Sequence, residues 1–164
     1  GKNSDTVQKD PPLAGTEPKN APNTNEVVAS YLQLKNALAN DNAKEAAIAG
    51  KAVSEAVQQM NNAALNADQR KLYDDVKEDM QEHGEHISTN EDKIAHQREH
   101  FDMLSAGMYD LVKAIGSEQT LYKDHCPMYN DGKGANWLSE TKEIKNPYMG
   151  KKMRTCGSVK EEMK

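Results

Sequence analysis

The chain is poor in cysteine, in aromatic side chains and in long apolar runs. Its 164 residues include two cysteines, one phenylalanine and one tryptophan, and only 36% are hydrophobic. No apolar run approaches the roughly 20 residues that a membrane-spanning helix needs, so we expect no transmembrane segment. Basic residues are also few, giving a net charge of -5. This balance argues against a nucleic-acid partner, because phosphate binding needs a basic surface.

Signatures of catalysis are missing as well. The sequence contains no nucleophile paired with a base, no phosphate-binding loop and no dinucleotide fingerprint. The segment HQREH, residues 96–100, is not the HExxH signature of zinc proteases, because its glutamate follows Arg98 rather than His96. We therefore expect the protein not to be an enzyme.

The opening segment has the composition of a linker. Four of the six prolines precede residue 25, among Asn, Thr, Lys and Asp and with almost nothing apolar. So little apolar surface cannot offset the entropy lost on ordering. We interpret residues 1–24 as a flexible tether behind a removed export signal, with a lipid anchor on the native N-terminus as a further expectation. Residues 25–164 are long enough for one domain.

Four segments between residue 25 and Gly116 have helical spacing. Apolar residues recur every three or four positions in 24–41, in 43–60, from 66 onwards and in 91–116. The run ISTNED, residues 87–92, has the pattern of a capping box at the start of the fourth segment. Short connections make neighbouring helices antiparallel, which predicts an all-α, up-down bundle of about four helices. After Gly116 we expect an irregular cap with turns, short helices or a small strand pair.

The second helical segment is rich in small residues. Its expected apolar stripe is made of Ile48, Ala49, Ala52, Val53, Ala56, Val57 and Met60. Small side chains let helix backbones approach closely, so we expect a tight contact with a neighbouring helix.

Soft donor atoms are concentrated near the C-terminus, between His125 and Gly157. Cys126 and Met128 stand two residues apart, and Met153 and Cys156 three apart. Thiolates and thioethers together suit Cu(I) or Ag(I), whereas zinc rarely binds methionine and fits this set less well. A metal site would use Cys126, Met128, Met153 and Cys156 as ligands, with His125 and Met149 as weaker candidates.

A disulfide explains the same two cysteines without a metal. Exported proteins often pair cysteines, and closing a loop of about thirty residues adds roughly 3–4 kcal/mol in the chain-entropy model. The methionines would then fill gaps in the core. The residues alone leave both interpretations open.

Several short motifs carry a family resemblance. "CPM", "GANWLS", "EIKNPYMGKKM" and "CGSV" resemble a family of Gram-negative periplasmic domains of unknown function, found alone as exported or lipid-anchored proteins or fused to the periplasmic adaptor subunits of copper/silver efflux pumps. The resemblance covers roughly residues 25–164. It implies a helical domain in the periplasm, with a metal-handling role and a heavy-metal efflux adaptor or pump as partner. It supplies no catalytic activity.

Other residues of these motifs have an architectural role in our interpretation. We expect Trp137 and Leu138 to plug the end of the bundle. We expect Asn146-Pro147-Tyr148 to form a turn closed by hydrogen bonds to the backbone. We expect unusual backbone dihedrals at three glycines, Gly134, Gly150 and Gly157.

Four histidines form two pairs at helical spacing. His83 and His86 are three apart at the end of the third helical segment, and His96 and His100 are four apart near the start of the fourth. Across a helical hairpin the four imidazoles could meet, and imidazole suits Zn(II) or Cu(II). The alternative is a set of ordinary surface histidines, with only His83 on the apolar stripe of its helix.

Overall fold

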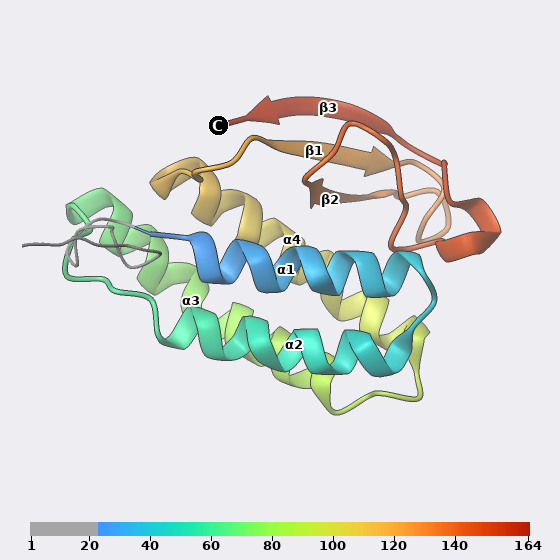
Figure 1. The fold of residues 1–164 in the computed structure, drawn as a ribbon, viewed down its shortest axis with the longest axis horizontal. Coiled ribbons are helices and arrows are strands. Elements are labelled where there is room, and N and C mark those ends of the chain that lie inside the picture. Colours follow the sequence, from blue (N-terminus) through green and yellow to red (C-terminus); the bar gives the residue numbers. More distant parts are fainter. Residues whose placement is uncertain (1–22) are drawn as a thin grey trace, which may run out of the picture.

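The structure, a computed structural model, describes residues 23–164 (Figure 1). Of the tether expected over residues 1–24, residues 1–22 lie outside the described residues, as do the predictions of an export signal and an anchor. Four helices are followed by three strands and a short 3₁₀ helix: α1 (Asn25–Ala39), α2 (Ala43–Gln58), α3 (Ala67–Ser88), α4 (Ile94–Ile115), β1 (Leu121–Cys126), β2 (Ala135–Ser139), η1 (Gly150–Met153) and β3 (Ser158–Met163). Within residues 23–164, no helix is both long and apolar enough to cross a bilayer.

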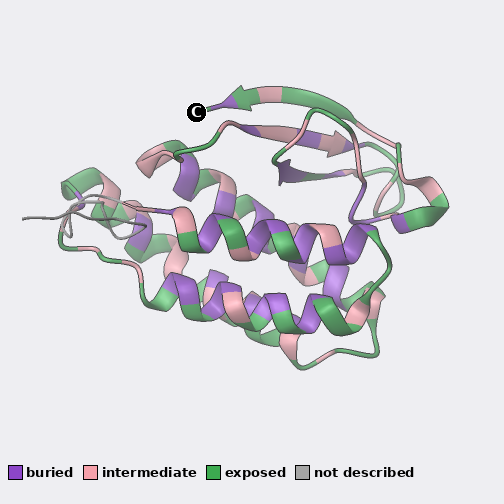
Figure 2. Ribbon diagram, viewed as in Figure 1, coloured by how far each residue is buried: buried purple, intermediate pink, exposed green. Residues whose placement is uncertain are grey.

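The helices form the predicted bundle, and a small sheet covers one of its sides. The sheet lies along α1 and α4, while α2 and α3 form the opposite side (Figure 1). Burial follows this arrangement: nine of the 15 residues of α1 are buried, against four of 22 in α3 (Figure 2). The hydrophobic core therefore lies around α1, between α2 and the sheet.

The tight contact predicted from small residues joins α2 to α3. A Cβ added at Gly84 would lie 2.7 Å from the carbonyl oxygen of Gly50, and one added at Gly50 would lie 2.7 Å from Cγ2 of Ile87. The predicted stripe of α2 is wrong at Ile48, which is 65% exposed. At 100° per residue Ile48 points almost opposite to Ala46 and Gly50, the residues through which α2 packs.

The side chains that cap the N-termini of α2 and α3 are asparagines, not serines or threonines. Asn42 caps α2 by accepting from the backbone N–H of Glu45, and Asn66 and Gln69 form a reciprocal capping box at the start of α3. The capping box predicted within residues 87–92 is wrong. Because α3 continues through Ser88, α4 begins only at Ile94, after Lys93 and without a side-chain cap.

The expectation of an all-α fold is wrong for the C-terminal part. The cap contains a three-stranded antiparallel sheet in the order β2-β1-β3, with Asp124 opposite Trp137 and His125 opposite Asn136. Strand β1 buries Leu121, Asp124 and Cys126, a spacing that does not alternate strictly and hides the strand period.

The sheet packs along the bundle rather than at its end. Trp137 and Leu138 are both 1% exposed, and the backbone N–H of Leu138 donates to the hydroxyl of Tyr31 on α1 at 3.0 Å. The outer strand β3 carries Lys160, Glu161 and Glu162, and such charges protect a sheet edge from pairing with other chains.

Candidate functional site: a dithiol in the cap and a histidine cluster on the bundle

The two cysteines lie side by side in the cap. Cys126 ends β1 and is buried, whereas Cys156 precedes β3 and is half-buried. Their Sγ atoms are 3.3 Å apart, although the residues are 30 positions apart in the chain, and both are free thiols. The structure thus brings together the pair on which both interpretations of the sequence depend.

Asn146 holds the arm that carries Cys156. Its Nδ2 donates to the carbonyl of Cys156 at 2.7 Å, and its Oδ1 accepts from the backbone N–H groups of Tyr148 and Met149 at 2.8 and 2.9 Å. The backbone N–H of Asn146 donates to the carbonyl of Arg154 at 2.8 Å. The predicted Asn-Pro-Tyr turn is therefore confirmed, and it also positions the second cysteine.

Gly157 permits the close approach of the two arms. It has φ +136°, and a Cβ there would lie 2.8 Å from the carbonyl oxygen of His125 and 3.1 Å from the ring of Trp137. Gly134 and Gly150 also have positive φ, as predicted. A side chain at residue 157 would push the segment that contains Cys156 away from β1.

The surroundings of Cys126 favour its thiolate. Burial opposes ionisation, but hydrogen bonds from Cys156, from the Asn146 side chain and from two backbone N–H groups, those of Met128 and Tyr129, hold the pKa of Cys126 below its usual value. Burial, the hydrogen bond to Cys126 and the charge on that sulfur raise the pKa of Cys156. The pair therefore consists of one thiolate-prone sulfur and one thiol that donates to it.

Of the other predicted ligands, Met128 and Met153 lie in the turns next to the cysteines, whereas Met149 and His125 make contacts elsewhere. Met128 follows Cys126 in the same turn, where its backbone N–H meets both sulfurs, and its side chain is 55% exposed. Met153 ends η1, and its carbonyl accepts from the N–H of Cys156 at 3.1 Å. Met149 packs against the core, and Nδ1 of His125 is engaged by Oδ1 of Asn136 at 2.7 Å. The two thiols form the site, with two methionines in the adjoining turns.

Aromatic side chains of the cap pack against one another and against a phenylalanine of α4. The Tyr148 ring packs against three others, those of Phe101, Tyr129 and Trp137, with centroids 4.6–6.0 Å apart. Its hydroxyl donates to the carbonyl of Asn136. Tyr148 and Trp137 thus pack within the cap, and Trp137 lies along the side of the bundle rather than at the end that we expected it to plug.

Arg98 ties the cap to the bundle, a role that the sequence did not reveal. It is 9% exposed; its Nε donates to the carbonyl of Pro147 at 2.7 Å, and one Nη donates to the carbonyl of Leu38 and to Oδ1 of Asp41. Gly150 makes room for this network, since a Cβ there would overlap Oδ1 of Asp41. An arginine within a charged run gave no signal of burial.

The four bundle histidines come together across α3 and α4. Nδ1 of His83 is 3.0 Å from Nδ1 of His100, and Nε2 of His100 is 3.3 Å from Nε2 of His96. The ring of His86 stacks on that of His100 with a centroid distance of 4.7 Å and an angle of 7°. His83 and His100 are half-buried, whereas His86 and His96 are exposed. The four imidazoles thus lie together across the hairpin, while two of them are exposed, as in the alternative of ordinary surface histidines.

A buried carboxyl group was also missed from the sequence. Asp124 is 0% exposed, and among residues 23–164 neither of its carboxylate oxygens nor Nε1 of Trp137 has a hydrogen-bond partner. Burial raises the pKa of Asp124 to about 7, opposed by the charge of Lys35. That lysine is itself fully buried and pairs with Glu140 at 2.7 Å.

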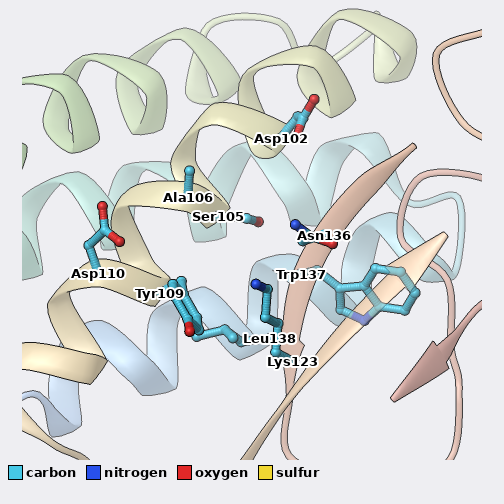
Figure 3. Close-up of a pocket in the computed structure, with 9 residues that line it drawn as sticks. All are labelled: Asp102, Ser105, Ala106, Tyr109, Asp110, Lys123, Asn136, Trp137 and Leu138. Carbon is cyan, nitrogen blue, oxygen red and sulfur yellow. The ribbon is translucent and has the colours of Figure 1, made fainter. Parts of the chain in front are cut away.

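A cavity of about 160 Å³ lies between α4 and the sheet (Figure 3). Asp102 and Asp110 approach it from α4 and Lys123 from β1, with Trp137 and Leu138 on the sheet side (Figure 3). Burial raises the pKa of Asp102. The cysteines and the clustered histidines do not line this cavity.

Comparison with known proteins gives a family but no activity. The segment 27–120, more than half of the chain, matches the model of a family described as "Protein of unknown function (DUF3347)". The chain belongs to the DUF3347 family. No curated protein and no solved structure matches it.

The DUF3347 match covers the bundle and stops where the cap begins. Its last residue, 120, directly precedes Leu121 of β1. The four clustered histidines lie inside the matched segment, and both cysteines lie outside it. Among residues 23–164, no three His, Cys, Asp or Glu side chains already surround one point as metal ligands. The described residues therefore present pairs of donors, one in the DUF3347 segment and one in the cap, rather than a complete set of metal ligands.

Proposed function

We propose that this protein is a metal-binding accessory domain that takes up Cu(I) or Ag(I) at Cys126 and Cys156. The observation that carries the proposal is the pairing of two free thiols, 3.3 Å apart, with Cys126 receiving hydrogen bonds that favour its thiolate. A thiolate is the form of cysteine that binds metals. The function is binding and ligand exchange, with no bond made or broken in a substrate.

The donor set fits a soft ion. Two sulfurs on one tetrahedral metal at about 2.3 Å each stand about 3.8 Å apart, so the pair needs to open by roughly 0.5 Å. Met128 and Met153 lie in the turns that carry the cysteines, and thioethers select Cu(I) over harder ions. Met128 is also exposed, so its side chain is free to swing towards an ion at no packing cost. Zinc fits this set less well.

We further propose that the domain works in the periplasm, beside a heavy-metal efflux adaptor or pump. Support comes from the resemblance of the cap motifs to domains fused to such adaptors. An exposed thioether beside a buried thiolate suits transfer, because the incoming and outgoing ligands can exchange at the exposed side. A lipid anchor on the native N-terminus would keep the domain at the membrane surface.

A second function follows from the same pair of sulfurs. Closing 3.3 Å to the 2.05 Å of a disulfide needs a movement of only about 1.2 Å, which the flanking turns can supply. The chain would then be a disulfide-stapled helical interaction module with no metal. Forming the bond removes two protons and two electrons from the thiols and so needs an external oxidant, such as the disulfide of an exchange partner. Oxidation and metal binding exclude each other, since both consume the thiolate.

A Cu(I) competition titration on fully reduced protein tests the first function. We expect Cys126→Ser and Cys156→Ser each to weaken Cu(I) binding by more than about 100-fold, since loss of an outer-shell partner alone costs 10- to 100-fold. Met128→Leu and Met153→Leu should weaken it by less. Met103→Leu is the matched control, because Met103 is a half-exposed methionine on α4.

Two outcomes decide against this function. Two thiols can bind Cu(I) in any chain, so binding no tighter than that of the urea-unfolded protein overturns the proposal. A thiol count on the native protein tests the alternative. If both cysteines resist alkylation until a reductant is added, and Cu(I) binding to the reduced chain shows no preference for the folded state, the stapled module is the function.

A further inference from the structure

The histidine cluster of α3 and α4 holds two nitrogen atoms at the spacing of metal ligands. Two nitrogens bound to one tetrahedral zinc at about 2.0–2.1 Å stand about 3.3 Å apart. Nε2 of His96 and Nε2 of His100 are 3.3 Å apart. The two residues are one helical turn apart on α4, so a regular backbone fixes their separation.

The outer nitrogens of these two rings are already engaged. Nδ1 of His96 lies 3.2 Å from a carboxylate oxygen of Glu99, and Nδ1 of His100 lies 3.0 Å from Nδ1 of His83. A carboxylate only accepts, so the proton of His96 is on Nδ1 and its Nε2 presents a lone pair to His100. In metal sites, ligating histidines donate the other ring N–H to such partners.

When all three rings are neutral and His96 carries its proton on Nδ1, one set of tautomers satisfies these contacts. In that set His83 Nδ1 donates to His100 Nδ1, and His100 Nε2 donates to His96 Nε2. The proton between the two Nε2 atoms occupies the place that a cation would take. Moving the proton of His100 to Nδ1 and that of His83 to Nε2 frees both facing nitrogens and leaves the number of bound protons unchanged.

We propose that His96 and His100 bind a borderline divalent cation, Zn²⁺ or Cu²⁺, through their Nε2 atoms, and that His86 supplies a third nitrogen. The ring of His86 already stacks on that of His100. His86 is exposed, and its Nε2 lies 3.7 Å from a carboxylate oxygen of Glu82, too far for a hydrogen bond, so a rotation of its side chain brings a nitrogen to the ion. Three imidazoles and water complete a tetrahedral site open to solvent.

His83 is a positioning residue in this site. It accepts the N–H of His100 when the metal is bound and so selects the tautomer that presents Nε2. Burial lowers the pKa of both His83 and His100, with the neighbouring imidazoles adding to the effect at His100. Neutral rings are the form that binds metal, and the nearby carboxylates Asp79, Glu82 and Glu99 favour a cation over an anion.

The site is independent of the dithiol. It shares no residue with the cap, and its imidazole donors suit borderline ions rather than Cu(I). The bundle and the cap would therefore carry two sites of different metal selectivity. An experiment that rules out one of these sites does not bear on the other.

Titration of the protein with Zn²⁺, followed by nitrogen-15 NMR of the imidazole rings, tests the proposal. The cysteines are alkylated first so that the thiols take no zinc. We expect one equivalent of Zn²⁺ to shift the ring signals of His86, His96 and His100 and to convert His83 to the Nε2–H tautomer. His125, in the cap, is the internal control and should not move.

Variants assign the roles. His96→Gln and His100→Gln should each weaken Zn²⁺ binding by more than about 100-fold, and His83→Gln by about 10-fold with the tautomer of His100 no longer fixed. His125→Gln should leave binding unchanged. Equal responses of His125 and the cluster to Zn²⁺, or no response at all, overturn the site, and full affinity in His86→Gln overturns the role of the third ligand. Cu(I) affinity of unmodified, reduced His100→Gln should equal that of the wild type.

Discussion

The side-chain amide of Asn146 donates a hydrogen bond to the backbone carbonyl of Cys156 at 2.7 Å, and the same amide donates to the sulfur of Cys126. One buried side chain thus touches both arms of the dithiol. Asn146 therefore couples the folding of the Asn-Pro-Tyr turn to the chemistry of the cysteines, because a displacement of its side chain changes the distance between the two sulfurs.

Replacement of Asn146 should weaken both the fold and the thiolate. Asn146→Ala leaves buried backbone groups without partners and should cost about 2–4 kcal/mol in the free energy of unfolding. Asn146→Asp keeps the acceptor oxygen but loses the donor and adds a negative charge, so the pKa of Cys126 should rise. Urea unfolding measures the first effect and the pH dependence of alkylation the second. Asn40→Ala, at an exposed asparagine at the end of α1, is the control, and an unchanged alkylation profile in Asn146→Asp would contradict the coupling.

Arg98 should be needed to keep the cap on the bundle. Arg98→Lys retains the charge but cannot reach both the carbonyl of Pro147 and that of Leu38, so we expect a loss of about 2–4 kcal/mol. Arg70→Lys, at an exposed site on α3, should change stability by less than about 0.5 kcal/mol. Chemical denaturation compares the two. Equal stabilities would show that the network around Arg98 contributes nothing.

Asp124 should make the protein more stable in mild acid than in mild base. Its pKa is raised by burial to about 7 in the folded state, above the value of about 3.9 for an unfolded chain. The contribution of Asp124 to the free energy of unfolding is therefore fully favourable below pH 4 and is lost as the pH rises through 7. Asp124→Asn removes the charge, so this variant should gain at least about 1 kcal/mol over the wild type at pH 8.

Thermal unfolding at pH 5 and at pH 8 measures this effect. The difference between Asp124→Asn and the wild type should shrink or reverse at pH 5, where Asp124 is protonated in the folded state. Glu143→Gln, at an exposed carboxylate, is the control for changes in net charge. A difference that stays constant between the two pH values would contradict a titrating Asp124.

Gly84 should tolerate no larger side chain. Its Cβ would lie 2.7 Å from the carbonyl oxygen of Gly50, so Gly84→Ala forces α2 and α3 apart. We expect a loss of about 1–3 kcal/mol despite the higher helix propensity of alanine. Glu85→Ala is the control: this next position on α3 is exposed, so the substitution changes helix propensity but not the packing of α3 against α2. Calorimetry measures the stability of both variants. A Gly84→Ala protein more stable than the wild type would show that α2 and α3 can move apart without loss of stability.

Much of the bundle could be predicted because its signals are local. Asn42 and Asn66 mark helix starts by hydrogen bonds that span three residues, and the small residues of α2 indicate a close neighbour without naming it. The sheet could not be predicted in the same way. Strand β1 buries a carboxyl group, that of Asp124, at a position where an apolar residue would have made the two-residue period of a strand visible. Its pairing with β2 and β3 depends on contacts between residues that are far apart in the sequence.

The candidate sites show the same division. Sequence spacing placed His96 and His100 on one helical face and singled out both cysteines by their scarcity, because donor type and helical period are properties of the chain itself. Tertiary structure alone decided that the sulfurs stand 3.3 Å apart, that the Asn146 side chain favours one thiolate, and that Arg98 joins cap to bundle. Those relationships connect residues 10 to 60 positions apart, and only the packed backbone fixes such distances.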